Sequence, residues 1–355
     1  MLRGKKRLFL GFIYLMAAVQ FVWCYMSLSE SWISTPLYEN GLAKMPYQGR
    51  MLMMFPLRWA HSDMLFHLLA DPLHLSHYWF SRHNAPEVLV QAVINVLCVL
   101  LAGYLTTKLY VVSSRTGLLR DLVFPVFLVA CTATYIMHTA QNLRFVYDLP
   151  SLAFFSVAMC LIYFRKHWGY FVALFIVATV NRETTLFLLP LFMLDRAVED
   201  GRLNWRLLFR PSTLAVFVPL GFAWIGWEAF VHHLYAHNPT EMYPRLWWNE
   251  KSLLLVYAWP QLLSTCGFLL PFMFLLRRKI RDPQLVAWMW IVPVWGVFMF
   301  VFGILVETRV FGELIPYVVC TSSLILEDLV IAKVQRMKRY GYQVHEEGIS
   351  VRRAA

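Results

Sequence analysis

The sequence has few charged residues: only 15% of its 355 residues are Asp, Glu, Lys or Arg. A soluble domain usually carries about 25%. By contrast, 59% of this chain is hydrophobic, and its mean hydropathy is +0.54. Such a chain cannot cover an aqueous surface with enough charge. Because membrane helices need roughly 20 apolar residues each, the composition predicts an all-α, polytopic transmembrane helical bundle.

Several sequence motifs are also missing. There is no G-x-x-x-x-G-K-[ST] loop, which excludes an ATP-driven motor of that type, and no G-x-S-x-G or H-E-x-x-H motif. No internal repeat of the kind found in many transporters is visible. None of the six cysteines forms a C-x-x-C pair. All six lie in apolar runs, where we expect them to be small buried hydrophobic residues.

The net charge of +11 does not indicate nucleic-acid binding. Nucleic acid requires a continuous basic face, whereas here the basic residues fall in short clusters between apolar runs. That distribution is typical of cytoplasmic loops in membrane proteins. We therefore expect the lipid bilayer as a partner, and no nucleic acid.

The apolar runs predict about ten helices. The expected ranges are 8–28, 86–107, 121–138, 149–164, 168–181, 184–195, 211–233, 252–275, 283–304 and 310–330. One prediction has an alternative, because 168–195 is a single apolar run interrupted by Asn181-Arg182-Glu183. A single helix would place its two basic flanking loops on opposite sides of the membrane. Two short helices meeting at the polar triplet keep both loops inside.

The charges orient this arrangement. With ten helices both termini are cytoplasmic, and the inner side holds 23 of the 32 Lys and Arg but only 9 of the 21 Asp and Glu. Such asymmetry sets membrane orientation. We expect one transmembrane domain over 1–332, with an outer loop over 29–85, and a basic cytoplasmic tail over 333–355. Within that loop, 51–69 has apolar residues at helical spacing, so it could lie flat on the membrane surface.

Charged residues recur at the outer ends of the predicted helices. A charge in the bilayer is costly and usually faces a cavity or a partner. We interpret these residues as the lining of an outward-facing cavity that holds a lipid phosphate or another substrate, since the planar guanidinium suits phosphate. A carboxylate among them could act as a general base. The alternative is structural ion pairs that only hold helices together. The residues are Arg50, Arg144, Asp148, Arg182, Glu183, Glu307, Arg309 and Glu313.

Histidines are dense between residues 61 and 83. Two or three of them could join Asp63 or Asp71 around a divalent metal ion. No pair has H-x-x-x-H spacing, and histidines are common at membrane interfaces. We therefore assign no metal ligand and no cofactor, and a divalent metal stays the alternative. The histidines are His61, His67, His74, His77 and His83.

One segment after the first helix reads Glu39-Asn40-Gly41-Leu42-Ala43-Lys44-Met45-Pro46-Tyr47-Gln48-Gly49-Arg50. Two polar breaks follow further along the chain, Tyr147-Asp148-Leu149-Pro150 and Asn181-Arg182-Glu183-Thr184. Together these three segments resemble the GT-C superfamily of polytopic membrane glycosyltransferases, and the two breaks are similar to those of such bacterial multi-spanning proteins. As an architecture, the resemblance covers about 1–330.

The resemblance implies an enzyme that takes a sugar from a polyprenyl-phosphate donor on the outer side of the membrane. It implies Glu39, or less well Glu30, as the catalytic base, and Arg144, Arg182 and Arg309 as residues that hold the lipid phosphate. Two other functions stay open: a polymerase or ligase of polyprenyl-linked polysaccharide, and a membrane transporter or flippase. The acceptor could be a glycan, a lipid or a protein. The lack of an N-x-[ST] acceptor is compatible with a bacterial inner membrane.

Overall fold

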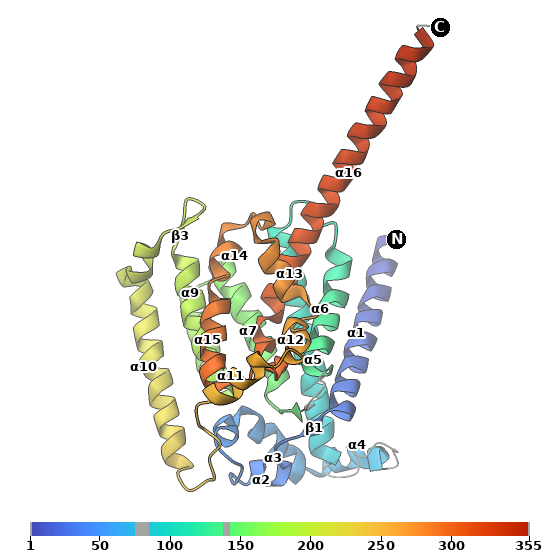
Figure 1. Cartoon of the computed structure of the whole chain (residues 1–355). Coiled ribbons are helices and arrows are strands. Elements are labelled where there is room, and N and C mark those ends of the chain that lie inside the picture. The colour runs from blue at the N-terminus through green and yellow to red at the C-terminus, as the bar shows by residue number, and fades with distance from the viewer. Residues whose placement is uncertain (1, 75–84, 138–142, 354–355) are drawn as a thin grey trace.

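The structure, a computed structural model, describes residues 2–74, 85–137 and 143–353, and the side chains of 5–72, 85–137 and 143–337. Over those residues it consists of helices, loops and two pairs of two-residue strands. β1 (Glu30–Ser31) pairs in parallel with β2 (Leu143–Arg144), and β3 (Val198–Glu199) pairs antiparallel with β4 (Arg202–Leu203). Figure 1 shows a helical bundle with both chain termini at the same end.

Five segments of the described chain are helical, long and apolar enough to cross a membrane, as expected for a membrane protein. They are Lys5–Leu28 within α1 (Leu2–Leu28), α5 (Ala85–Ser113), α10 (Pro211–Leu234), Pro283–Phe302 and Thr308–Met337. The fourth comprises α14 (Pro283–Trp288) and α15 (Ile291–Phe302). The fifth comprises the 3-10 helix η7 (Thr308–Leu314) and the first part of α16 (Ile315–Arg353), whose end projects beyond the bundle in Figure 1.

Shorter helices complete the bundle: α6 (Arg120–Tyr135), α7 (Asp148–Tyr163), α8 (Trp168–Asn181) and α9 (Leu188–Arg196). The core gathers around α7 and α16, where Trp288, Trp295 and Tyr317 are completely buried. Burial of such large aromatic side chains supplies much of the stability of a packed core. The helices predicted over 8–28, 86–107, 121–138, 149–164, 168–181 and 211–233 all overlap a helix of the structure.

The single helix predicted over 252–275 is wrong. The structure has three short helices there: α11 (Leu246–Leu254), α12 (Ala258–Leu263) and α13 (Leu269–Leu275). Pro260 lies in the first turn of α12, where proline is tolerated because that amide has no helical acceptor. Before α13, Cys266, Gly267 and Phe268 all have a positive φ, which ends a right-handed helix. The apolar composition continues through both interruptions of the helix, so the sequence pattern did not indicate them.

The polar triplet at 181–183 separates two helices that form a hairpin. α8 ends at Asn181, and the 3-10 helix η4 (Glu183–Phe187) leads into α9. At the far ends of these helices, Arg165 lies 3.7 Å from Asp195. This ion pair holds the loop before α8 and the end of α9 together at one end of the bundle. Of the two arrangements that the sequence allowed, the structure has the two-helix one.

Basic loops gather at the end of the bundle that carries the termini. Lys6 in α1 pairs with Asp121 in α6 at 3.1 Å, and Arg281 pairs with Asp328 in α16. The connection between β4 and α10 contains the 3-10 helix η5 (Trp205–Phe209). A second 3-10 helix, η6 (Arg277–Lys279), precedes α14. The contacts bring the loops around residues 115–121 and 277–282 to the same end as the N-terminus.

The predicted outer loop covers the opposite end (Figure 1). It comprises α2 (Thr35–Glu39), the 3-10 helices η1 (Tyr47–Gly49) and η2 (Met51–Met53), α3 (Met54–Ser62) and α4 (Met64–His74). The predicted surface helix over 51–69 is broken at Asp63, where the backbone is extended. Met64, Leu65 and Leu68 of α4 are exposed. Exposed apolar side chains at this position suit contact with the membrane surface.

Candidate functional site

A cavity of about 700 Å³ opens at the end of the bundle away from the termini. Segments far apart in sequence form its walls: the outer loop, residues 143–145 and 182–184, the last turns of α10, residues 241–248, the end of α15 and residues 303–310. Five of the predicted charged residues line it, namely Arg50, Arg182, Glu183, Glu307 and Arg309. Its size is that of a small-molecule binding site.

Arg50 and Glu183 form a bidentate ion pair in the cavity wall. The Nε of Arg50 donates to Oε2 of Glu183 at 2.8 Å, and a second guanidinium nitrogen donates to Oε1. Arg50 also stacks on the ring of Tyr147, with 4.3 Å from the guanidinium carbon to the ring centroid. Burial alone would lower the pKa of Arg50, but Glu183 raises it overall, so this arginine stays charged.

A second group of charges extends from the cavity wall into the bundle behind it. Arg182, which is 4% exposed, donates to Asp148 at 3.1 Å and contacts Glu313 at 2.9 Å; both carboxylates are completely buried. The hydroxyl of Thr184 donates to Glu313 at 3.0 Å. Arg309 bonds Glu307 and lies 3.9 Å from Asp148. Asp148 and Glu313 therefore balance the arginines from behind and do not themselves line the cavity.

The pairing in this second group is incomplete. In the described part of the chain, the Nε atoms of Arg182 and Arg309, one carboxylate oxygen of Glu313 and the hydroxyl of Tyr147 are buried without a hydrogen-bond partner. A buried donor without a partner costs about 1–3 kcal/mol. The second group therefore contains buried polar atoms whose hydrogen-bonding capacity is not used by the described residues.

Two charged residues line the cavity without an ion-pair partner among the described side chains: Glu228 on α10, and Arg245 before α11. The guanidinium of Arg245 stacks 3.7 Å from the ring centroid of Tyr243, and one of its nitrogens donates to the backbone oxygen of Glu241 at 3.2 Å. One turn after Glu228, His232 also faces the cavity. Glu228 and His232 were not among the predicted site residues, although both lie at the end of an apolar run; Arg245 lies in a connection with no such signal.

A third charged group forms the edge of the cavity. Glu241 accepts hydrogen bonds from Lys44 at 2.7 Å and from Tyr47 at 3.0 Å. Burial alone would raise the pKa of Glu241, but these two hydrogen bonds lower it overall. The two bonds tie the outer loop to the segment before α11, so that both segments contribute walls to one cavity.

Besides Asp148 and Glu313, three more predicted site residues lie outside the cavity. Arg144 donates to the backbone oxygens of Met26 and Ser29, and so satisfies carbonyls at the end of α1. Glu30 is exposed on β1. Glu39 is buried beside Glu87 and His61; burial and the charge of Glu87 raise its pKa.

Comparison with known protein families, with curated proteins and with solved structures found no match for this chain.

Proposed function

We propose that this chain is an integral membrane glycosyltransferase of the GT-C type, which takes a sugar from a polyprenyl-phosphate donor. The observation that carries the proposal is the cavity at one end of an apolar helical bundle, with a guanidinium and a carboxylate that have no ion-pair partner among the described residues. Arginine suits phosphate because its planar group donates parallel hydrogen bonds. Neither group would be retained in a cavity wall for stability alone.

Arg245 is the main phosphate-binding residue in this proposal. It lines the cavity and forms no ion pair with a described carboxylate, whereas Arg50 and Arg309 are already paired with Glu183 and Glu307. The two paired arginines act indirectly in this proposal, because each holds its partner carboxylate away from the phosphate.

The lipid chain of the donor can remain in the bilayer. α10 forms one side of the cavity, yet only Thr213, Leu220 and Val231 of its 24 residues are buried. Phe222 and Phe230 on the same helix are exposed. A helix that faces lipid on one side and the cavity on the other allows a phosphate headgroup to enter beside it while the prenyl chain stays among the acyl chains.

Glu228 is the general base of the proposed reaction. The acceptor hydroxyl attacks the anomeric carbon, its proton passes to the Glu228 carboxylate, and the bond from the anomeric carbon to the phosphate oxygen breaks. Polyprenyl phosphate leaves with that electron pair. A carboxylate held by an arginine is a weaker base than an unpaired one, so Glu228 suits this role better than Glu183 or Glu307. Glu39, the base implied by the resemblance, does not line the cavity.

The proposed orientation places both termini and the basic loops in the cytoplasm, and the cavity on the periplasmic face of a bacterial inner membrane, with about ten membrane-crossing segments. Basic residues at the termini end support it, since cytoplasmic loops are rich in Lys and Arg. The short helices α6 to α9, and the segment that comprises α12 and α13, are then membrane segments that cross with the five long ones.

A transfer assay tests the proposal. Purified protein in nanodiscs is given undecaprenyl phosphate carrying radiolabelled glucose, mannose or a pentose, together with membrane lipid as acceptor. We expect Glu228→Gln to lower transfer about 100-fold or more, and Arg245→Ala to raise the KM about tenfold or more. Glu250→Gln and Arg206→Ala, at exposed positions outside the cavity, are the matched controls.

The products separate the proposal from its alternatives. One added sugar supports a transferase, and a ladder of repeats indicates a polymerase or ligase. Exchange of labelled donor across the membrane without any covalent product indicates a transporter or flippase. Full transfer by Glu228→Gln together with loss by Glu39→Gln would move the base to the residue implied by the resemblance.

A further inference from the structure

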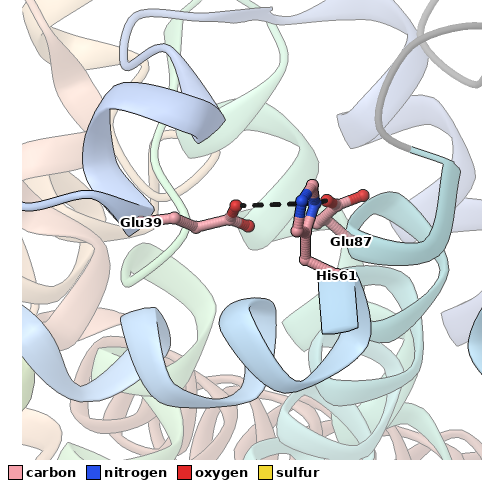
Figure 2. Close-up of side chains that lie close together, drawn as sticks. All are labelled: Glu39, His61 and Glu87. Atoms are coloured by element: carbon pink, nitrogen blue, oxygen red, sulfur yellow. Dashed lines mark hydrogen bonds and ion pairs between the residues drawn. The ribbon is translucent and has the colours of Figure 1, made fainter. Parts of the chain in front are cut away.

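A cluster of three metal-ligating side chains lies outside the cavity, where the outer loop packs on the start of α5. Glu39 ends α2, His61 lies near the end of α3, and Glu87 lies in the first turn of α5. Figure 2 shows the three side chains pointing toward one another. The Nδ1 of His61 lies 2.6 Å from Oε1 of Glu87 and 4.0 Å from Oε2 of Glu39. One ligand atom from each side chain lies within 4.8 Å of the other two.

The two carboxylates have unused oxygens in a buried position. The side chain of Glu39 is 7% exposed and that of Glu87 is 4% exposed. Oε1 of Glu39 and Oε2 of Glu87 are buried and accept no hydrogen bond from the described residues. Two carboxylates so close together and so poorly hydrated repel each other, and each unsatisfied oxygen adds a desolvation cost. A bound cation would remove both costs.

We propose that Glu39, His61 and Glu87 bind one divalent transition-metal ion, such as zinc, and that this ion clamps the outer loop onto α5. Imidazole together with carboxylate suits zinc or manganese, whereas calcium and magnesium prefer sites built from oxygen alone. Tetrahedral zinc with bonds of about 2.1 Å holds neighbouring ligand atoms about 3.4 Å apart. Glu39 would move slightly toward His61, and Glu87 slightly away from it.

The surroundings of the three side chains allow an ion to enter. The side chain of His61 is 66% exposed, so the open coordination positions face solvent. The Nε2 of His67 lies 2.8 Å from the backbone oxygen of His61. One cation is already near: Arg58 bonds the backbone oxygen of Glu39, while its charge acts on the carboxylate. The metal displaces the proton shared by His61 and Glu87, and that proton leaves to solvent.

The sequence analysis assigned no metal ligand, and its alternative joined the histidines with Asp63 or Asp71. His61 meets Glu39 and Glu87, and does not meet Asp63 or Asp71; the carboxylate of Asp63 instead accepts from Trp59 at 3.1 Å. His77 and His83 lie outside the described residues, as does the side chain of His74. The pairing of Glu39 with Glu87 joins residues 48 positions apart, which only the folded loop brings together.

The clamp would also support the cavity. Between Glu39 and His61 the loop carries Tyr47 and Arg50 into the cavity wall. Directly before that segment, Tyr38 donates its hydroxyl to the backbone oxygen of Arg50. Fixing both ends of the segment to α5 restricts the positions that Arg50 can adopt. The metal proposal does not depend on the proposed glycosyl transfer.

Metal content and thermal stability test the site directly. The full-length protein is purified in detergent, stripped with EDTA, equilibrated with ZnCl₂ or MnCl₂, desalted and analysed for bound metal. We expect about one ion per chain, and a midpoint of thermal unfolding that rises by several degrees when metal is restored. His61→Ala and Glu87→Gln should each weaken binding at least tenfold. Exposed His233→Ala and Glu250→Gln should retain the wild-type metal content.

Two outcomes would overturn the proposal: a wild-type protein that retains neither zinc nor manganese, or variants at His61 and Glu87 that bind as much metal as wild type. His61→Ala keeps the test decisive if Glu87→Gln fails to fold, because His61 is largely exposed. Both readouts are made without a sugar donor, so loss of glycosyl transfer alone leaves the metal result unaffected.

Discussion

Removal of the Arg182 guanidinium should destabilise the protein strongly. Arg182 is 4% exposed and contacts Asp148 at 3.1 Å and Glu313 at 2.9 Å, both completely buried. In Arg182→Met, two carboxylates lose the cation that lies between them, and the nearest remaining guanidinium is that of Arg309, 3.9 Å from Asp148. Breaking a buried ion pair by removing one partner costs about 3–5 kcal/mol. A loss of 1 kcal/mol lowers the midpoint of thermal unfolding of a large domain by about 2 °C, so this midpoint should fall by roughly 6–10 °C.

Tryptophan fluorescence of the purified protein in detergent measures this midpoint. Arg281→Met, which breaks an exposed ion pair with Asp328, is the matched control and should change the midpoint by about 2 °C at most. Adding Asp148→Asn and Glu313→Gln to Arg182→Met removes the unbalanced charges, so the triple variant should recover much of the loss. An equal, small shift for Arg182→Met and Arg281→Met would refute the claim that these charges are buried and paired.

Three further predictions concern packing, pH and orientation. A Cβ at Gly312 would overlap the hydroxyl of buried Tyr135, so Gly312→Ala should cost about 1–3 kcal/mol in thermal unfolding, while Gly226→Ala, which meets open space, should not destabilise. The folded-state pKa of Glu241 is lowered, so its stabilising contribution is complete above the ordinary Glu pKa of about 4.3 and is lost as pH falls through the lower folded value. Thermal unfolding between pH 6 and pH 3 should therefore show a steeper acid loss for wild type than for Glu241→Gln, and equal slopes would contradict the pairing with Lys44 and Tyr47. A fluorescent protein fused after residue 355 should be fluorescent and alkaline phosphatase at the same place inactive; the reverse would invert the proposed orientation.

Much of the helical layout could be predicted from apolar runs alone. A membrane helix must be long and apolar, and the ranges for α5, α7, α8 and α10 followed directly. The break at residues 266–268 could not be predicted, because Cys266 and Phe268 carry no signal for the left-handed backbone that they adopt. The hairpin at 181–183 was predictable as one of two alternatives, and the Arg165–Asp195 ion pair distinguishes them.

The candidate site was predictable only where a charge interrupts an apolar run. Arg182, Glu183, Glu307 and Arg309 satisfied that criterion, and they line one cavity together with Arg50 of the outer loop. Arg144 satisfied it too, yet its guanidinium bonds the last carbonyls of α1, a contact that depends on the parallel pairing of β1 with β2.

Arg245 was missed for the opposite reason. It lies in a polar connection, and its place in the cavity depends on Tyr243 and on the backbone of Glu241. Local sequence thus identifies charges that are costly to place in a membrane, but tertiary contacts decide which of them line the cavity.

Photolabelling tests the central claim most directly. Purified protein is exposed to undecaprenyl phosphate-glucose with a diazirine on the prenyl unit next to the phosphate, and the labelled peptides are mapped after irradiation. The proposed function predicts labelling within residues 222–232 and 298–309, reduced about tenfold in Arg245→Ala and by excess unlabelled donor. Labelling spread along the exposed faces of α1 and α5, unaffected by Arg245→Ala or by competing donor, would contradict it.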